Sequence, residues 1–81
     1  MRVKIFVRLK EGVLDPQGKA VEQSLHALGH EEVRDVRVGK YIELEIAATS
    51  RQTAEKRVRE MCDKLLANPV IEDYRFEISN E

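Results

Sequence analysis

The sequence has little cysteine and no excess of charge of one sign. Its one cysteine, Cys62, can form neither an internal disulfide nor a multi-thiolate metal site. Fourteen basic residues stand against 15 acidic ones, and this balance argues against a dedicated nucleic-acid binder, which neutralises phosphates with basic side chains. Tryptophan is absent, and the chain has neither a stretch of about 18 apolar residues nor an N-terminal stretch typical of a signal peptide. We therefore expect a soluble, cytoplasmic protein with a modest core.

The first third of the chain has the pattern of a half-buried strand followed by a capped helix. Residues 2–9 alternate between apolar and mostly charged side chains, which is typical of a strand. Asp15 is a suitable N-cap because its carboxylate accepts from the free amides of a first helical turn, and Pro16 suits the first helical position. Apolar residues then recur at helical spacing as far as Gly29, a residue type that commonly ends helices.

The middle of the chain predicts a β-hairpin and a second helix. Residues 36–38 and 41–46 flank Gly39–Lys40, which is a suitable two-residue hairpin turn. The segment Thr49–Gln52 has the spacing of a capping box. A helical stripe follows, consisting of Ala54, Val58, Met61 and Leu65 and thickened by Cys62 and Leu66. Pro69 ends this helix because proline disfavours helical geometry in the residue before it.

With a last strand at residues 74–78, the order β-α-β-β-α-β predicts a ferredoxin-like α+β sandwich. Its four-stranded antiparallel sheet would have the order 4-1-3-2, and right-handed crossovers would place both helices on one face. We expect charges of both signs on the open face, namely Lys4, Arg8, Glu43, Glu45 and Glu77. Phe6 is the single large apolar group expected there, either in an oligomer contact or under the stems of ion pairs.

No group of residues has the spacing of a catalytic or metal site. Cys62 lies beside the apolar stripe and is interpreted as a core residue rather than a nucleophile. His26 and His30 are one helical turn apart, but Gly29 lies between them and no third ligand is evident. Asp15 is interpreted as an N-cap rather than a general base. We therefore predict no catalytic, cofactor-binding or metal-binding residue in this chain.

Three short segments are distinctive in their order and spacing. They are VLDPQG at residues 13–18, VRVGK at residues 36–40 and NPVIE at residues 68–72. Together they resemble the PurS family, the small subunit of phosphoribosylformylglycinamidine synthase (formylglycinamide ribonucleotide amidotransferase). Any one of the three would be a weak signal, but the resemblance covers essentially the whole chain. It implies a single PurS-like domain over residues 1–81.

The resemblance implies a part in the fourth step of de novo purine synthesis. In that step formylglycinamide ribonucleotide, glutamine and ATP become formylglycinamidine ribonucleotide, glutamate, ADP and phosphate. Amidation, with ATP and magnesium, is expected on a large synthetase subunit (PurL), and glutamine hydrolysis on a separate glutaminase subunit (PurQ). The small subunit is expected to bind no cofactor and to form a homodimer or homotetramer. It would help to hold the two enzymes together so that ammonia passes between them, without nucleic-acid or membrane partners.

Two loops are candidates for docking on the large subunit. A preformed corner and a tight hairpin tip present fixed backbone shapes, which bind at low entropic cost. The candidate interface residues are Asp15, Pro16, Gln17, Gly18, Arg37, Gly39 and Lys40. The alternative is that these residues only shape the fold, since turns need glycine and proline for their own reasons.

Two other functional classes compete with a subunit of this kind. A small-ligand-binding regulatory module of ferredoxin-like fold would show ligand-dependent thermal stabilisation. An RNA-binding domain would need an excess of basic residues and aromatic side chains on the sheet face, and only Phe6 is expected there. The sequence favours the subunit, then the ligand-binding module, then RNA binding.

Overall fold

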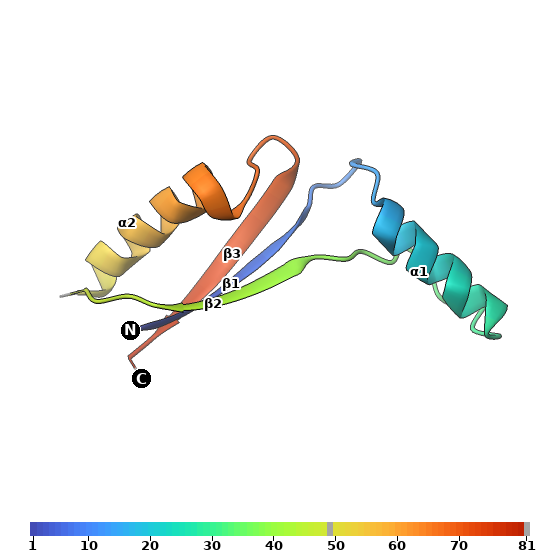
Figure 1. Cartoon of the computed structure of the whole chain (residues 1–81), viewed down its shortest axis with the longest axis horizontal. Coiled ribbons are helices and arrows are strands. Elements are labelled where there is room, and N and C mark those ends of the chain that lie inside the picture. The colour runs from blue at the N-terminus through green and yellow to red at the C-terminus, as the bar shows by residue number, and fades with distance from the viewer. Residues whose placement is uncertain (49, 81) are drawn as a thin grey trace.

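The chain forms three strands and two helices in an elongated arrangement (Figure 1). The computed structural model describes residues 1–48 and 50–80. The elements are β1 (Arg2–Leu9), α1 (Pro16–Ala27), β2 (Lys40–Glu45), α2 (Arg51–Met61), a π-helical turn (Cys62–Leu66) and β3 (Glu72–Ser79). The radius of gyration is 16.1 Å, whereas a compact chain of this length would have about 12 Å.

The sheet is antiparallel, with β1 in the centre and the order β2-β1-β3. Ile5 of β1 lies opposite Ile42 of β2 and Phe76 of β3. Because both outer strands are antiparallel to β1, they run parallel to each other, and α2 connects them as a crossover. This half of the chain has the β-α-β arrangement that the sequence predicts for its last strands.

The core lies between α2 and one face of the sheet. It consists of Val3, Ile5, Val7, Ala54, Val58, Cys62, Ala67 and Ile78. The buried residues of β1 alternate with exposed or half-buried ones, as the apolar pattern predicts. Cys62 is fully buried, so the interpretation of this residue as part of the core is confirmed.

Both helices begin at residues whose side chains accept from free amides of the first turn. Asp15 accepts from the Gly18 amide at 2.8 Å, and Ser50 accepts from the Thr53 amide at 3.1 Å. The sequence predicted a capping box that starts at Thr49, which lies outside the described residues. Gly29 has a φ of +99° and ends the first helix as predicted, because this left-handed conformation favours glycine.

Replacing Ser50 with alanine is expected to destabilise the protein by about 1 kcal/mol, because the Thr53 amide loses its acceptor. Urea unfolding followed by far-ultraviolet circular dichroism measures this loss. Gln52→Ala changes an exposed residue in the same first turn and serves as the control, with a change within about 0.5 kcal/mol. Equal stabilities for the two variants would contradict the role of Ser50 as the cap.

The predicted fourth strand and the hairpin are wrong. Residues 33–39 belong to no strand, and the chain enters β2 at Lys40, opposite Val7. The Val38 amide donates to the Asp15 carboxylate at 2.8 Å rather than to a neighbouring strand. Gly39 does not form a turn. It allows a close approach to β1, because an added Cβ would lie 2.5 Å from the Val7 carbonyl oxygen. The ferredoxin-like four-stranded sandwich is therefore corrected to a three-stranded sheet with one helix on its face.

The prediction that both helices cover the sheet is also wrong. Figure 1 shows α1 beyond the end of the sheet, at the tip of a long projection formed with the two segments that flank it. We call residues 10–39 the arm. The handedness rule that predicted the packed position applies to parallel strands, whereas β1 and β2 are adjacent and antiparallel. The connection between them is therefore a long hairpin that contains a helix. The rule does not apply to such a connection, so it does not require α1 to pack on the sheet.

Candidate functional site

The base of the arm is held together by one carboxylate. Asp15 is 8% exposed, and its two oxygens accept from the amides of Gly18 and Val38, each at 2.8 Å. The Gly18 amide is the main cause that lowers the pKa of Asp15 below its ordinary value, followed by the Val38 amide and, more weakly, by the Arg37 charge. Arg37 in turn donates to the Val13 carbonyl oxygen at 2.7 Å. The two sides of the arm are thereby tied to each other where α1 begins.

The predicted docking residues differ in how exposed they are. Asp15, Gly18 and Arg37 lie together at the base of the arm, where Asp15 and Gly18 are buried. Gly18 has no room for a side chain, because a Cβ there would overlap the Val36 carbonyl oxygen. All three residues therefore contribute to the fold, and their part in docking stays a prediction.

The other four predicted docking residues are exposed. Pro16 and Gln17 lie in the first turn of α1, and Gly39 and Lys40 lie at the start of β2. The Lys40 ammonium group is 3.4 Å from the Leu66 carbonyl oxygen and 3.9 Å from the Glu72 carboxylate. Pro16 and Gly39 directly follow Asp15 and Val38, which are hydrogen-bonded to each other, so the exposed residues lie on both sides of the base of the arm.

The open face of the sheet carries a small aromatic and cationic cluster. The Phe6 ring lies 5.1 Å from the Tyr41 ring, centroid to centroid, and the Arg75 guanidinium lies 4.0 Å from the Phe6 centroid. Arg2 pairs with Glu45 at 2.9 Å and with Glu43 at 3.6 Å. Phe6 is thus half-buried among charged side chains, as one of the two sequence interpretations has it.

Tyr41 is not among the residues that the sequence pattern predicted for the open face. Alternation along β2 places Tyr41, Glu43 and Glu45 on one face, and the register sets Tyr41 directly opposite Phe6. This was readable from the same period-2 pattern that identified the strand. The Tyr41 hydroxyl donates to Glu43 at 2.7 Å, and this bond is the main cause that raises the pKa of Tyr41.

The cysteine and the histidines show no arrangement for chemistry. Burial is the main cause that raises the pKa of the Cys62 thiol, so this thiol stays protonated and is a poor nucleophile. His26 Nε2 lies 2.7 Å from the Val33 carbonyl oxygen, a contact that holds the tip of the arm. Within residues 1–48 and 50–80, no three histidine, cysteine or acidic side chains come together as a possible metal site. No helix in the same residues is long and apolar enough to cross a membrane.

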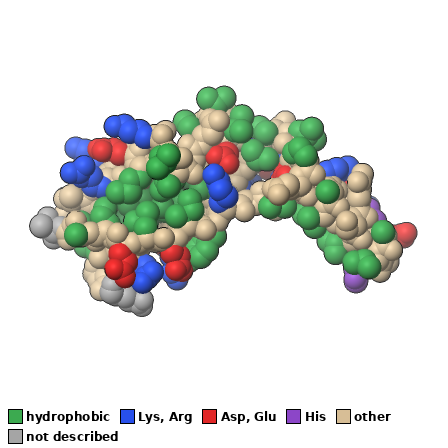
Figure 2. All heavy atoms as spheres, in the orientation of Figure 1, with side chains coloured by type: hydrophobic (Ala, Val, Ile, Leu, Met, Phe, Trp, Pro, Cys, Tyr) green, Lys and Arg blue, Asp and Glu red, His purple; other side chains and the backbone are tan. Residues whose placement is uncertain are grey.

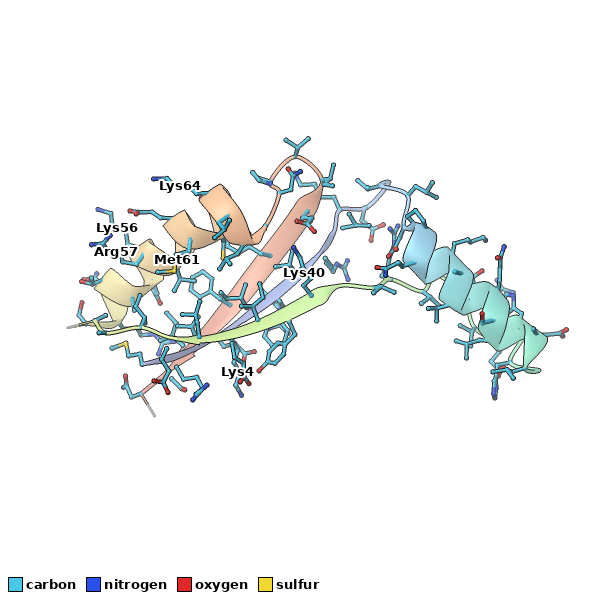
Figure 3. All side chains as sticks on the ribbon, in the orientation of Figure 1. Lys4, Lys40, Lys56, Arg57, Met61 and Lys64 are labelled. Atoms are coloured by element: carbon cyan, nitrogen blue, oxygen red, sulfur yellow. The ribbon has the colours of Figure 1, made fainter. Side chains whose placement is uncertain are left out.

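A groove between α2 and β2 is lined mainly by apolar side chains. Two adjoining hollows form it, and both are lined by Arg57 and Met61; the apolar residues along them are Leu44, Ile46, Ala48, Leu65 and Leu66. Figure 2 shows the apolar side chains gathered on this face, with basic side chains along one border. In Figure 3, Lys56 and Arg57 extend from α2, and Lys64 extends from the π-helical turn, along that border. We call this feature the α2–β2 groove.

The helical period predicts that Leu65 lies in the apolar stripe of the second helix, and this prediction is wrong. Leu65 is 81% exposed. The reason is the π-helical turn at Cys62–Leu66, in which the Ala67 amide donates to the Cys62 carbonyl oxygen five residues earlier. A wider turn rotates the residues away from the period of an α-helix, so the stripe extrapolated from Ala54 and Val58 no longer points into the core.

The fold and these surfaces define a small α+β protein with a projecting arm, an apolar groove and a charged sheet face. The family model for PurS, described as phosphoribosylformylglycinamidine (FGAM) synthase, matches residues 2–80. The chain belongs to the PurS family.

Similar proteins cover nearly the whole chain. The phosphoribosylformylglycinamidine synthase subunit PurS of Bacillus subtilis is 57% identical over 77 residues, which is 95% of this chain and 90% of that protein. The subunit of the same description from Synechocystis is 51% identical and covers 94% of this chain and 76% of that protein.

Solved structures agree with the fold. A crystal form of B. subtilis PurS has a TM-score of 0.88 at 56% identity and covers 98% of each chain. A chain in the structure of PurLQS from Thermotoga maritima has a TM-score of 0.85 at 34% identity and covers 94% of this chain and 93% of that chain.

Proposed function

We propose that this chain is the small, non-catalytic subunit of a phosphoribosylformylglycinamidine synthase. It assembles the ATP-dependent synthetase subunit with the glutaminase subunit, so that ammonia passes from glutamine hydrolysis to the amidation of formylglycinamide ribonucleotide in the cytoplasm. The observation that carries this proposal is the match, over nearly the full length of both chains, to a chain in the T. maritima PurLQS structure. Self-association of this chain as a homo-oligomer is part of the proposal.

ATP and magnesium belong on the large partner subunit in this proposal. The residues that the structure describes bring together no set of three metal-ligating side chains. The four glycines of the chain do not have the spacing of a phosphate-binding loop.

Reconstitution tests this function. The synthetase and glutaminase subunits are mixed with and without this chain, and glutamine-dependent amidation is measured. Activity is expected only with the chain present. Amidation with ammonium chloride as nitrogen source is the control, because free ammonia bypasses transfer between subunits and should need the chain far less. Equal glutamine-dependent rates in both mixtures would overturn the proposal.

The exposed members of the predicted docking set define a second test. Lys40→Glu and Gln17→Ala are each expected to weaken binding to the large subunit several-fold, since charge and shape at a rim set partner recognition. Gln23→Ala, at another exposed position of α1, is the control. Assembly is measured by analytical ultracentrifugation. Unchanged affinity in both variants would show that these loops only shape the fold.

A further inference from the structure

The loop between the π-helical turn and β3 contacts the chain on both sides of the arm. The Lys10 amide, where the chain enters the arm, donates to the Ile71 carbonyl oxygen at 2.9 Å. The Lys40 ammonium group, directly after the arm, lies 3.9 Å from the Glu72 carboxylate. Figure 1 shows this loop beside the end of β1. Residues 68–72, which we call the bracket, therefore contact both ends of the arm.

The bracket is held in shape by its own hydrogen bonds. The Asn68 carbonyl oxygen accepts from the amides of Ile71 and Glu72 at 3.1 and 2.7 Å. The Asn68 side-chain oxygen accepts from the Val70 amide at 3.1 Å, and the Glu72 carboxylate accepts in return from the Asn68 amide at 2.6 Å. Pro69 has a fixed φ, which reduces the entropy lost when the loop is ordered. The bracket is thus a preformed support for the residues that it contacts.

Glu72 connects the bracket to the chain that returns from the arm. One of its carboxylate oxygens binds the Asn68 amide, and the other faces the Lys40 ammonium group. The Glu72 side chain is 16% exposed and the Lys40 side chain is 56% exposed. Lys40, at the start of β2 (Figure 3), also lies 3.4 Å from the carbonyl oxygen of Leu66, the last residue of the π-helical turn. The first residue after the arm is thereby tied to the bracket and to the end of the helical segment.

Helix α1 itself does not pack on the sheet. Among the described residues, none from α1 belongs to the core or to the apolar side chains packed against it. On the entering side, Gly12 has a φ of +82°, and an added Cβ there would meet nothing within 4 Å, so the backbone has room to rotate. On the returning side, Gly39 lies against the Val7 carbonyl oxygen. The direction of the arm therefore depends on the bracket and on the chain at these two glycines.

The arm is built to move as one body. Contacts join α1 to the returning chain from the base of the arm to its tip, namely Asp15 with the Val38 amide, Glu22 with the Asp35 amide and His26 with the Val33 carbonyl oxygen. These contacts lie within the arm, and the bracket takes no part in them. A change at the bracket therefore leaves the arm folded and alters only its direction.

We propose that the bracket fixes the direction of the arm, with Glu72 as its central positioning residue. Held at Lys10 and Lys40, the arm points away from the sheet. When the bracket is loosened, the arm rotates as a rigid body about Gly12, in the manner of a hinge. A single exposed ion pair contributes little to folding, so the direction of the arm changes at little cost in stability. The bracket acts within one chain and does not depend on the proposed function.

Distances between two spin labels test the bracket. The labels are attached at Gln23→Cys on α1 and Gln52→Cys on α2, both exposed positions, while Cys62 is buried. Labelled chains are diluted with an excess of unlabelled chains, so that double electron–electron resonance reports distances within one chain. The wild-type chain is expected to give one narrow distance distribution, because both ends of the arm are held.

Variants of the bracket are compared in this labelled chain. Glu72→Ala and Lys40→Met are each expected to broaden the distribution about twofold, because a freed arm samples several directions. Lys40→Arg keeps the charge and should retain the narrow distribution. Asp73→Ala and Lys64→Met make the same types of change at exposed positions and are the matched controls. Circular dichroism confirms that each variant is folded, and Lys40→Met tests the proposal even if Glu72→Ala is poorly folded.

Hydrogen exchange separates rotation of the arm from its unfolding. The Gly18 amide, bound to Asp15 at the base of the arm, and the Ile5 amide, in the central strand, are followed by NMR. In Lys40→Met both exchange rates are expected to stay within about twofold of the wild-type rates, since each part keeps its own contacts. Faster exchange at Gly18 alone would show that the base of the arm opens, and rigid-body rotation would be wrong.

The remaining outcomes overturn the proposal in recognisable ways. Distributions as narrow in Glu72→Ala and Lys40→Met as in the wild type would show that other contacts direct the arm. A broad wild-type distribution would show that the bracket does not hold it, and equal broadening in the control variants would remove the special role of Glu72 and Lys40. The labels report on this chain without its partners. Glutamine-dependent amidation is measured separately, so the subunit role can fail or stand independently of the bracket.

Discussion

Replacing Gly18 with alanine is expected to destabilise the protein by about 2 kcal/mol, although the residue lies in a helix. Helix propensity alone would favour alanine by about 1 kcal/mol. The added methyl group, however, would overlap the Val36 carbonyl oxygen and would lie 3.0 Å from the Asp15 carboxyl carbon. Backbone atoms cannot move aside as a flexible side chain does, and overpacking of this kind costs about 1–3 kcal/mol or more. The steric term therefore outweighs the propensity term.

Chemical denaturation followed by circular dichroism measures the change. Gln23→Ala is the matched control, because it introduces alanine at an exposed position of the same helix, where a change within about 0.5 kcal/mol is expected. A Gly18→Ala variant as stable as the wild type would show that the two sides of the arm separate without loss. The close approach would then not be what orients α1.

Replacing Asp15 with alanine is expected to reduce stability more than Ser50→Ala does, because two backbone amides lose their acceptor instead of one. The Asp15 carboxylate binds the Gly18 amide within α1 and the Val38 amide on the far side of the arm. A backbone amide without a partner is costly when it is shielded from water. Asp15→Asn retains the shape and one acceptor oxygen, so its stability should lie between those of the alanine variant and the wild type. Thermal unfolding measures all three.

Asp15 also makes the stability of the protein depend on pH. The two amides hold the folded-state pKa of Asp15 below its ordinary value of 3.8. A carboxyl group with a lowered pKa stabilises the fold above its unfolded-state value, and this stabilisation disappears as the pH falls through the folded-state value. Wild-type stability should therefore decrease from slightly above pH 3.8 downwards more steeply than that of Asp15→Asn. Asp73→Asn, at an exposed position, is the control, and parallel pH profiles for wild type and Asp15→Asn would contradict the role of Asp15.

Local features of the sequence predicted local structure well. Alternation placed Val3, Ile5 and Val7 on the buried side of β1, and Asp15 with Pro16 placed the start of α1 at the observed residue. Each of these signals acts within a few residues, through side-chain direction or a first-turn hydrogen bond. They do not depend on how the elements pack.

The wrong predictions of the hairpin and the fourth strand involve residues that contact a segment far away in the sequence. Gly39 has the residue type of a hairpin turn, but it is small because β1 passes close to it. Val36 and Val38 have strand-like residue types, but the Val38 amide is bound by Asp15, a residue 23 positions earlier. Leu65 continued an apolar period that the π-helical turn interrupts. For Gly39, Val36 and Val38, one residue type suits two structures, and only the neighbour across space distinguishes them; Leu65 is displaced by a local change of helical period.

The sequence by itself determined the location of three strands and two helices, the starting residue of α1 and the family to which the chain belongs, together with a fourth strand that does not form. The tertiary structure decided where α1 lies and which apolar residues stay exposed. The physical reason is that an amphipathic helix carries the same stripe whether it covers its own sheet or a partner's. Its position depends on contacts between residues 13–18 and residues 36–38: Asp15 binds the Val38 amide, Gly18 lies against Val36, and Arg37 binds the Val13 carbonyl oxygen.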